Sequence, residues 1–356
     1  MIKVLVVDDS ALVRKLIGKA FSTEADFEVQ FARTGREALA AIASSRPDVV
    51  TLDVQMPEMD GLACLDRIMI ETPCPVVMVS ATTAAGADAT LEALRLGAVD
   101  FVAKPTGAVS LQFDDVALSL IEKVRAAAGA RLKTSLRLRE KVRFKIGDSG
   151  RAVQPTSVRK ARPSAKGDGL VLVGTSTGGP PALEALLTDL PASFPWPIVV
   201  AQHMPATFTG SLAQRLNGIS RLEVQEVRNP IALKPGHVYI GRGDADVIIS
   251  KRGAGLVAMA APSQPDYPWH PSTDRLVRSA LNHMAPSHLI GILMTGMGND
   301  GAAAMTLLHS GGGRTIAEAE ETAVVWGMPG ELVKANGADF VVPVDKIAAQ
   351  LKKLVS

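Results

Sequence analysis

The feature that most limits how this sequence can fold is a repeated alternation of short apolar runs with longer helical patterns. In the first third of the chain the apolar runs fall at positions 3–7, 27–31, 49–52, 76–79 and 101–102. In the second half they fall at 170–173, 198–201, 238–240, 289–294 and 340–342. Amphipathic stretches such as SALVRKLIGKAF lie between them. Because strands that alternate with helices favour a parallel sheet covered on both faces, the sequence predicts an α/β protein with two doubly wound parallel-sheet domains.

The two predicted domains are separated by a basic stretch without apolar periodicity. Residues 115–128 have the pattern of a last helix of the first domain. The basic residues that follow are Arg131, Lys133, Arg137, Arg139, Lys141, Arg143 and Lys145. Regular aromatic interleaving, which is typical of sites for single-stranded nucleic acid, is absent, so no nucleic-acid partner is expected. We predict one domain over 1–128, a flexible linker over 129–167 and a second domain over 168–356.

The composition excludes several other classes of protein. No run of about 18 uncharged apolar residues occurs, so we do not expect insertion into a membrane. The two cysteines, Cys64 and Cys74, both lie in the first domain, which argues against a disulfide framework or a cysteine-based metal site. The net charge is only +2, which argues against a binder of polyanions. The first residues form an apolar run without the pattern of a signal peptide, so a cytoplasmic location is expected.

Charged residues gather at the predicted strand ends of the first domain. Asp8, Asp9 and Asp53 follow two apolar runs, and Ser80 and Lys104 follow two others. In a doubly wound sheet these positions meet at one edge, where ligands bind. Converging carboxylates repel one another unless a cation joins them, and hard oxygen ligands suit Mg²⁺. The alternative is a set of solvated loop acids with a surface lysine.

The segments VVDDS, LDVQMPEMDGL, VVMVSA and VDFVAKP, in this order, resemble the receiver domain of two-component response regulators. The resemblance implies a flavodoxin-like fold in which Asp53 accepts a phosphoryl group from a histidine kinase. It implies a Mg²⁺ site formed by Asp8, Asp9, Asp53 and the carbonyl of Gln55. It also implies switch roles for Ser80, Phe101 and Lys104, and a cis Lys104–Pro105 bond.

In the second domain, the stretch LVLVGTSTGGPP predicts a buried strand, a tight turn and the start of a helix. Ser176 would then lie at the carboxyl end of a strand beside the positive end of a helix. An exposed hydroxyl there can attack, and nearby N–H groups can hold an oxyanion. The alternative is a phosphate-binding or purely structural turn.

A histidine and an aspartate follow two further predicted strands of this domain. His203 follows the apolar run of PIVVAQHMP, and Asp300 lies in the glycine-rich turn of LIGILMTGMGNDGA. Converging strand ends would bring a nucleophile, a general base and an orienting carboxylate together. The order Ser, His, Asp and the turn GTSTGG both differ from those of α/β hydrolases. Taken singly, His203 could be a hydrogen-bonded residue at a strand end, and Asp300 a helix N-cap.

The segments GTSTGGP, QHMP, HPSTDRL and TGMGNDG resemble the catalytic domain of the chemotaxis protein-glutamate methylesterases, the CheB family. The resemblance implies a Rossmann-like three-layer domain in a phosphorylation-activated hydrolase that serves sensory adaptation. It implies that Ser176 attacks a glutamate methyl ester of a chemoreceptor, while His203 acts as base and then acid and Asp300 orients it. Backbone N–H groups of Thr177 and Met297 would form the oxyanion hole. Receptor glutamines would be deamidated by the same chemistry, without a cofactor.

Other residues of these segments are assigned supporting roles. His270, Ser272 and Asp274 are expected to shape the site, with Asp274 capping the helix DRLVRSAL. Residues 326–329 are expected to form a wall of the site. Two alternatives remain: a phosphorylation-gated serine hydrolase with another ester substrate, and a non-catalytic regulator that binds a nucleotide or DNA. The absence of a Walker lysine speaks against the second.

Overall fold

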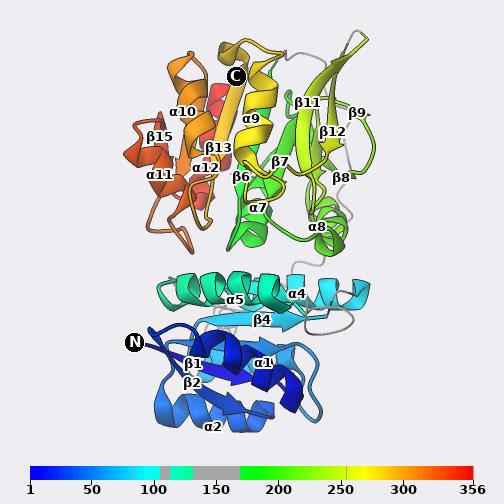
Figure 1. Ribbon diagram of the computed structural model, residues 1–356. Coiled ribbons are helices and arrows are strands. Elements are labelled where there is room, and N and C mark those ends of the chain that lie inside the picture. The colour runs from blue at the N-terminus through cyan, green and yellow to red at the C-terminus, as the bar shows by residue number, and fades with distance from the viewer. Residues whose placement is uncertain (82, 105–112, 131–168, 254, 356) are drawn as a thin grey trace, which may run out of the picture. The chain divides into compact units, whose positions relative to one another are not determined.

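The computed structural model describes residues 1–81, 83–104, 113–130, 169–253 and 255–355. The chain divides into two compact units, Met1–Val153 and Gln154–Ser356, and each is described by itself (Figure 1). Nearly all of the predicted linker over 129–167 lies outside the described residues, as does Pro105 of the predicted cis bond.

The first unit is built on a five-stranded parallel sheet with the order β2-β1-β3-β4-β5. Its strands are β1 (Ile2–Val7), β2 (Phe27–Ala32), β3 (Val49–Asp53), β4 (Val76–Ser80) and β5 (Asp100–Ala103). Strands β3 and β4 are buried along their whole length, as expected for apolar runs covered on both faces. This strand order is that of the predicted flavodoxin-like fold.

Helices cover both faces of this sheet. They are α1 (Ala11–Ser22), α2 (Gly35–Ser45), α3 (Gly61–Glu71), α4 (Ala84–Leu96) and α5 (Phe113–Ala128). Helix α1 packs against α5, while α2, α3 and α4 pack against one another in succession. Polar side chains directly before four of these helices accept a hydrogen bond from the first turn, which is why each helix begins there: Ser10, Thr34, Asp60 and Thr83.

The second unit is built on a seven-stranded parallel sheet with the order β15-β14-β13-β6-β7-β10-β8 (Figure 1). Its strands are β6 (Leu170–Thr175), β7 (Ile198–Gln202), β8 (Glu223–Val227), β10 (His237–Gly241), β13 (Leu289–Leu293), β14 (Arg314–Glu318) and β15 (Phe340–Val342). Strands β6, β7 and β13 lie in the middle and are fully buried. Strands β11 (Asp246–Arg252) and β12 (Gly255–Ala261) pair antiparallel and form a small sheet with β9 (Ile231–Ala232).

Helices form two layers around the seven-stranded sheet. They are α7 (Gly179–Thr188), α8 (Ala206–Ile219), α9 (Thr273–Leu281), α10 (Ala302–Ser310), α11 (Met328–Lys334) and α12 (Val344–Leu354), with a short 3₁₀ helix, Pro286–His288. Helix α7 packs against α8 and α12, and α10 packs against α9 and α11. These contacts give the predicted three-layer α/β arrangement. None of the helices in the described part of the chain is long and apolar enough to cross a membrane.

Two strands of the large sheet are absent from the sequence-based prediction. Strand β8, EVQEV, lies at the edge of the sheet and exposes part of its length, so it lacks a continuous apolar run. Strand β14, RTIAE, follows three glycines and is mostly buried between β13 and β15. Its strand conformation comes from its two neighbours rather than from a long apolar run of its own.

Candidate functional site

Three neighbouring strands of the second unit end at the same edge of the sheet. Thr175 at the end of β6 is paired with Gln202 at the end of β7. On its other side, β6 pairs with β13 up to Leu293. The residues that directly follow these strands are therefore brought together, including Ser176 and His203. The chain order also reverses at β6, and such a switch point is where doubly wound sheets bind ligands.

The turn after β6 fixes the position of Ser176. Its N–H donates to the carbonyl of Thr295 at 3.0 Å, and its carbonyl accepts from Gly179 N at 2.8 Å. Gly178 has a φ of +77°, which disfavours other residues, and a Cβ there would overlap Val324. The glycine pair thus allows the sharp turn into α7, which has proline in its first turn as predicted.

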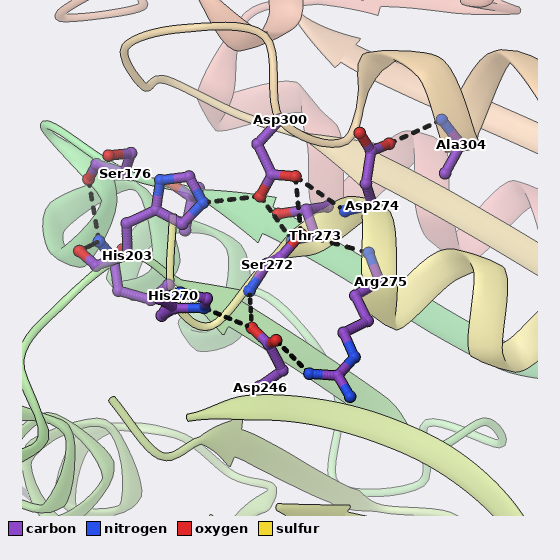
Figure 2. A network of polar contacts seen from close by, with 12 residues as sticks. Ser176, His203, Asp246, His270, Ser272, Thr273, Asp274, Arg275, Asp300 and Ala304 are labelled. Carbon is purple, nitrogen blue, oxygen red and sulfur yellow. Dashed lines mark hydrogen bonds and ion pairs between the residues drawn. The ribbon is translucent and has the colours of Figure 1, made fainter. Parts of the chain in front are cut away.

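The ring of His203 is held by Asp300. Its Nε2 lies 2.8 Å from Oδ2 of Asp300, and its side chain is only 9% exposed. Figure 2 shows the ring between Ser176 and Asp300. Since a carboxylate can only accept, Nε2 carries a proton in this contact, and in a neutral ring Nδ1 then presents its lone pair. Nδ1 is buried and has no hydrogen-bond partner among the described residues, and the Ser176 hydroxyl makes no hydrogen bond to it.

Asp300 accepts four hydrogen bonds and is 3% exposed. Its donors are His203 Nε2 (2.8 Å), Thr273 N (2.6 Å), Ser272 Oγ (2.9 Å) and Asp274 N (3.0 Å). Burial acts to raise the pKa of this carboxyl, but the hydrogen bonds from His203 and from the backbone of α9 outweigh it, and the pKa is lowered. Asp300 is therefore ionised at neutral pH, as an orienting carboxylate must be.

The starts of α9 and α10 are capped across the gap between them. Asp300 directly precedes the α10 region but accepts from the first turn of α9, and Asp274 in α9 accepts from Ala304 N of α10 at 2.7 Å (Figure 2). Ser272 is the N-cap of α9 and accepts from Arg275 N. The prediction that Asp274 caps its own helix is therefore wrong. The reason is tertiary: α9 and α10 pack together, and each places an acid at the other's positive end.

This cross-capping gives a testable prediction for Asp274. Asp274→Ala leaves the first turn of α10 without its acceptor, so the free energy of unfolding should fall by about 1 kcal/mol. The backbone N–H of residue 274 still donates to Asp300, so turnover should change far less than stability. Denaturant titration of the full chain measures the first effect. Asp345→Ala, at the exposed start of α12, is the matched control, and an equal loss in both variants would contradict the cap.

Asp246 fixes the loop that leads into α9. It accepts from Ser272 N at 2.7 Å, His270 Nδ1 at 3.0 Å and Arg275 Nη1 at 2.5 Å. His270 therefore shapes the loop, as predicted. The same loop places Trp269 with its ring stacked on His203, at 6.1 Å between centroids and 5° between planes. Sequence reasoning missed Asp246, because this residue lies in β11, far from HPSTDRL along the chain.

The opposite side of the site is formed by the turn after β13. Gly296 pairs with Trp326, and its carbonyl accepts from the N–H groups of Gly327 and Met328. A Cβ at Gly296 would lie 2.8 Å from Cβ of Ser176, so this turn is in close contact with the serine. Residues 326–329 thus pack behind the turn that carries Met297.

A fully buried acid, Glu318, holds the turn after β13 in place. It accepts from Thr295 N at 2.8 Å, while Oγ1 of Thr295 donates to the carbonyl of Thr177 at 2.8 Å. These bonds connect β14, the turn after β13 and the turn after β6. Sequence reasoning missed Glu318 and Thr295, since neither residue type signals a structural role by itself.

A cavity of about 420 Å³ lies next to Trp269 and Asp300. It is lined by Asp266, Tyr267, Pro268, Trp269, Asp274, Arg278, Asn299 and Asp300. Ser176 and His203 are not among these residues, so the cavity adjoins the site at Trp269 and Asp300 and does not include the serine.

In the first unit, the predicted acidic residues converge at the ends of β1 and β3. Carboxylate oxygens of Asp8, Asp9 and Asp53 lie within 4.8 Å of one another. The Lys104 ammonium lies 2.9 Å from Asp8 and 2.8 Å from Asp53. Burial raises the pKa of Asp53 against the lowering effect of Lys104. Three closely spaced carboxylates are a set of oxygen ligands that fits a hard divalent cation.

Arg14 contacts this acidic cluster, and Ser80 and Phe101 lie on the next two strands of the sheet. Ser80 at the end of β4 is fully buried, and its hydroxyl donates to the carbonyl of Gly86 in α4 at 3.2 Å. Phe101 in β5 is 3% exposed, with the Lys123 ammonium 5.1 Å from its ring centroid. Arg14 donates to the carbonyls of Asp8 and Asp9, a contact that sequence reasoning missed.

Comparison with known families matches both units. A model described as CheB methylesterase matches residues 171–351, and one described as response regulator receiver domain matches residues 4–112. The chain belongs to the CheB methylesterase family. The predicted combination of a receiver domain with a methylesterase domain is thereby confirmed, as are the α/β fold of both and the classification as a hydrolase.

Individual members of the CheB family match along the whole chain. A protein-glutamate methylesterase/protein-glutamine glutaminase of Rhodopseudomonas palustris is 56% identical over 98% of this chain and 97% of its own length. One of Rhodospirillum rubrum is 50% identical over all of this chain and 97% of its own length. The crystal structure of the Thermotoga maritima CheB methylesterase catalytic domain is 38% identical, with a TM-score of 0.51, and covers 54% of this chain and all of its own.

Proposed function

We propose that this chain hydrolyses glutamate methyl esters on chemoreceptors, and deamidates glutamines there, with Ser176 as nucleophile. One observation carries the proposal: a buried imidazole with one nitrogen bound to the carboxylate of Asp300 and the other unpartnered. The arrangement leaves Nδ1 of His203 as the one ring atom able to take a proton. The names of the CheB relatives supply the substrate class.

In the acylation step, the Ser176 hydroxyl attacks the ester carbonyl and its proton passes to Nδ1 of His203. The charge that develops on the carbonyl oxygen is stabilised by the N–H groups of Thr177 and Met297, which form the oxyanion hole. The imidazolium then donates the proton to the departing methoxide, and methanol leaves. An acyl-enzyme ester between Ser176 and the glutamyl side chain remains.

In the second step, water takes the place of the alcohol. His203 removes a proton from the water, which attacks the acyl carbon, and the proton returns to Ser176 as the free carboxylate leaves. A glutamine substrate follows the same path with ammonia as the leaving group. Asp300 stabilises the imidazolium in both steps and holds the tautomer that leaves Nδ1 free.

In the receiver domain, we propose that Asp53 accepts a phosphoryl group from a histidine kinase and that this activates the esterase. Asp8, Asp9 and Asp53, with the carbonyl of Gln55, would hold Mg²⁺, which neutralises charge on the phosphoryl oxygens during transfer. Lys104 and Ser80 would contact the phosphoryl oxygens. Phe101 would take part in the accompanying switch.

Asp53→Asn tests this part of the proposal. Asparagine has no carboxylate oxygen that can accept a phosphoryl group, so the variant should lose the whole increase in turnover that a small phosphodonor and Mg²⁺ produce. The basal turnover should remain. Asp88→Asn, at an exposed position of α4, is the matched control and should respond like the wild-type protein. An undiminished increase in Asp53→Asn would assign the phosphorylation elsewhere.

The substrate assignment is tested with isolated receptor membranes. We propose a cytoplasmic enzyme that acts on the cytoplasmic helices of methylated receptors, so methanol should be released from such membranes and not from small generic esters. Equal or greater turnover of generic esters would favour a phosphorylation-gated hydrolase with another substrate.

A further inference from the structure

Gln202, the last residue of β7, lies between the turns that carry Ser176 and His203. Gln202 is only 2% exposed. Its Nε2 donates to the carbonyl of Ser176 at 3.0 Å and to the carbonyl of His203 at 3.1 Å. One carboxamide nitrogen therefore joins the main chains of the two residues that are proposed to exchange a proton.

The orientation of this amide is fixed by its two partners. Both are main-chain carbonyl oxygens, which only accept hydrogen bonds, so the NH₂ group must face them. The opposite orientation would place Oε1 against two oxygens. The carbonyl of Ser176 also accepts from Gly179 N, which holds it in place from the side of α7.

The oxygen of the same amide is left without a partner. Oε1 is buried and has no hydrogen-bond partner among the described residues. It lies against Gly179, where a Cβ would overlap it. Because buried polar atoms are almost always satisfied, an unpartnered oxygen calls for an explanation. An apolar side chain of similar length would avoid burying an unpartnered oxygen. The NH₂ group, which makes both hydrogen bonds, is therefore the reason for a glutamine at this position.

The place of this contact shows what the NH₂ group does. The bond from His203 N to the carbonyl of Thr175, at 3.0 Å, continues the β6–β7 pairing by one residue. Beyond it the two chains separate, one into α7 and the other into α8. Gln202 connects them at the level of Ser176 and His203, just past the end of the paired strands.

We propose that Gln202 is a positioning residue that sets the approach of the Ser176 hydroxyl to Nδ1 of His203 through the main-chain carbonyls of both. The inference rests on the proposed function, because it gives Gln202 a part in the same reaction. Both the acylation and the deacylation move a proton between these two side chains. A displacement of about 1 Å between reacting groups can cost roughly 10²-fold in rate.

Two variants test the inference. Gln202→Glu keeps the shape of the side chain but replaces the NH₂ group with an oxygen that faces both carbonyl oxygens. Gln202→Met removes the donor without adding charge. Both should lower kcat roughly 10²-fold, with KM changed by less than about twofold, because the substrate contacts remain. Gln225→Glu and Gln225→Met, at an exposed position of β8, are the matched controls and should keep the wild-type kcat.

Three measurements decide between the outcomes: methanol release from methylated receptor membranes, thermal melting, and the rate at which a fluorophosphonate modifies Ser176. A lower kcat with slower modification and a nearly unchanged melting temperature of Gln202→Met supports the inference. Wild-type kcat in both variants overturns it, as does a rise in KM alone. A loss of kcat that only follows a loss of folding also overturns it.

The failure of this inference can be told from the failure of the proposed function. If the wild-type protein releases no methanol from receptors, the substrate assignment fails. The modification rate of Ser176 then still tests Gln202, since it depends on Ser176 and His203 and not on the receptor. Equal modification rates in the wild-type protein and both variants would overturn the positioning role.

Discussion

Ser176→Ala should lower methanol release by about 10⁶-fold. The variant retains His203, Asp300 and the proposed oxyanion hole, but no acyl-enzyme can form. Ser176 is held through its main-chain N–H and carbonyl groups, so loss of the hydroxyl should change the free energy of unfolding by less than about 0.5 kcal/mol. The experiment compares turnover on methylated receptors with the denaturation midpoint of the same preparation.

The matched control for this variant is Ser310→Ala. Ser310 is exposed near the end of α10, and its hydroxyl donates only to the carbonyl of Thr306. This control should keep the wild-type turnover. Turnover of Ser176→Ala within about tenfold of the wild-type rate would move the nucleophile to another residue.

Asp300→Asn should have the second largest effect, with kcat lower by about 10⁴-fold. The amide could present its NH₂ group to Nε2 of His203, which would move the ring proton to Nδ1 and prevent that atom from accepting one from Ser176. If the amide turned the other way, its NH₂ group would face Asp274 N. In either orientation one backbone N–H of α9 loses its acceptor.

The same substitution should also destabilise the protein. Each unsatisfied buried donor costs about 1–3 kcal/mol, so the free energy of unfolding should fall by about that amount. The lowered pKa of Asp300 means that its carboxylate stabilises the fold above its unfolded pKa, and that this contribution is lost only as the pH falls through the lower, folded value. The contribution of the carboxylate itself should therefore be retained from neutral pH down to about pH 5.

Asp345→Asn, at the exposed start of α12, is the control for this experiment and should change neither quantity. Wild-type kcat in Asp300→Asn would show that the imidazole needs no orienting carboxylate. A stability difference that already declines near neutral pH would contradict the lowered pKa.

The sequence was sufficient to predict the parts of the fold that consist of buried parallel strands and the turns that follow them. Strands β6, β7 and β13 are continuous apolar runs, and Ser176, His203 and Asp300 follow them at turns rich in glycine or proline. The parallel arrangement of these strands then determines that the three turns meet. The acidic cluster could be predicted for the same reason, since Asp8 directly follows β1 and Asp53 is the last residue of β3.

The remaining parts of the site depend on contacts between distant segments. Asp246 lies in β11 and binds residues of α9, while Glu318 lies in β14 and binds the turn after β13. Asp274 fits its own helix as a cap by local rules, yet the packing of α9 against α10 gives it a different partner. Hydrogen-bond partners of this kind depend on how distant segments pack, so they cannot be predicted from a local sequence pattern.

The exchange of acids between α9 and α10 has a practical consequence for anyone who wishes to trap a receptor on this protein. Asp300 accepts hydrogen bonds from the imidazole of His203 and from the first turn of α9, so every substitution there lowers both activity and stability. The hydroxyl of Ser176 contributes little to stability. An inactive but folded variant that retains a bound receptor is therefore better made by substituting Ser176 than Asp300.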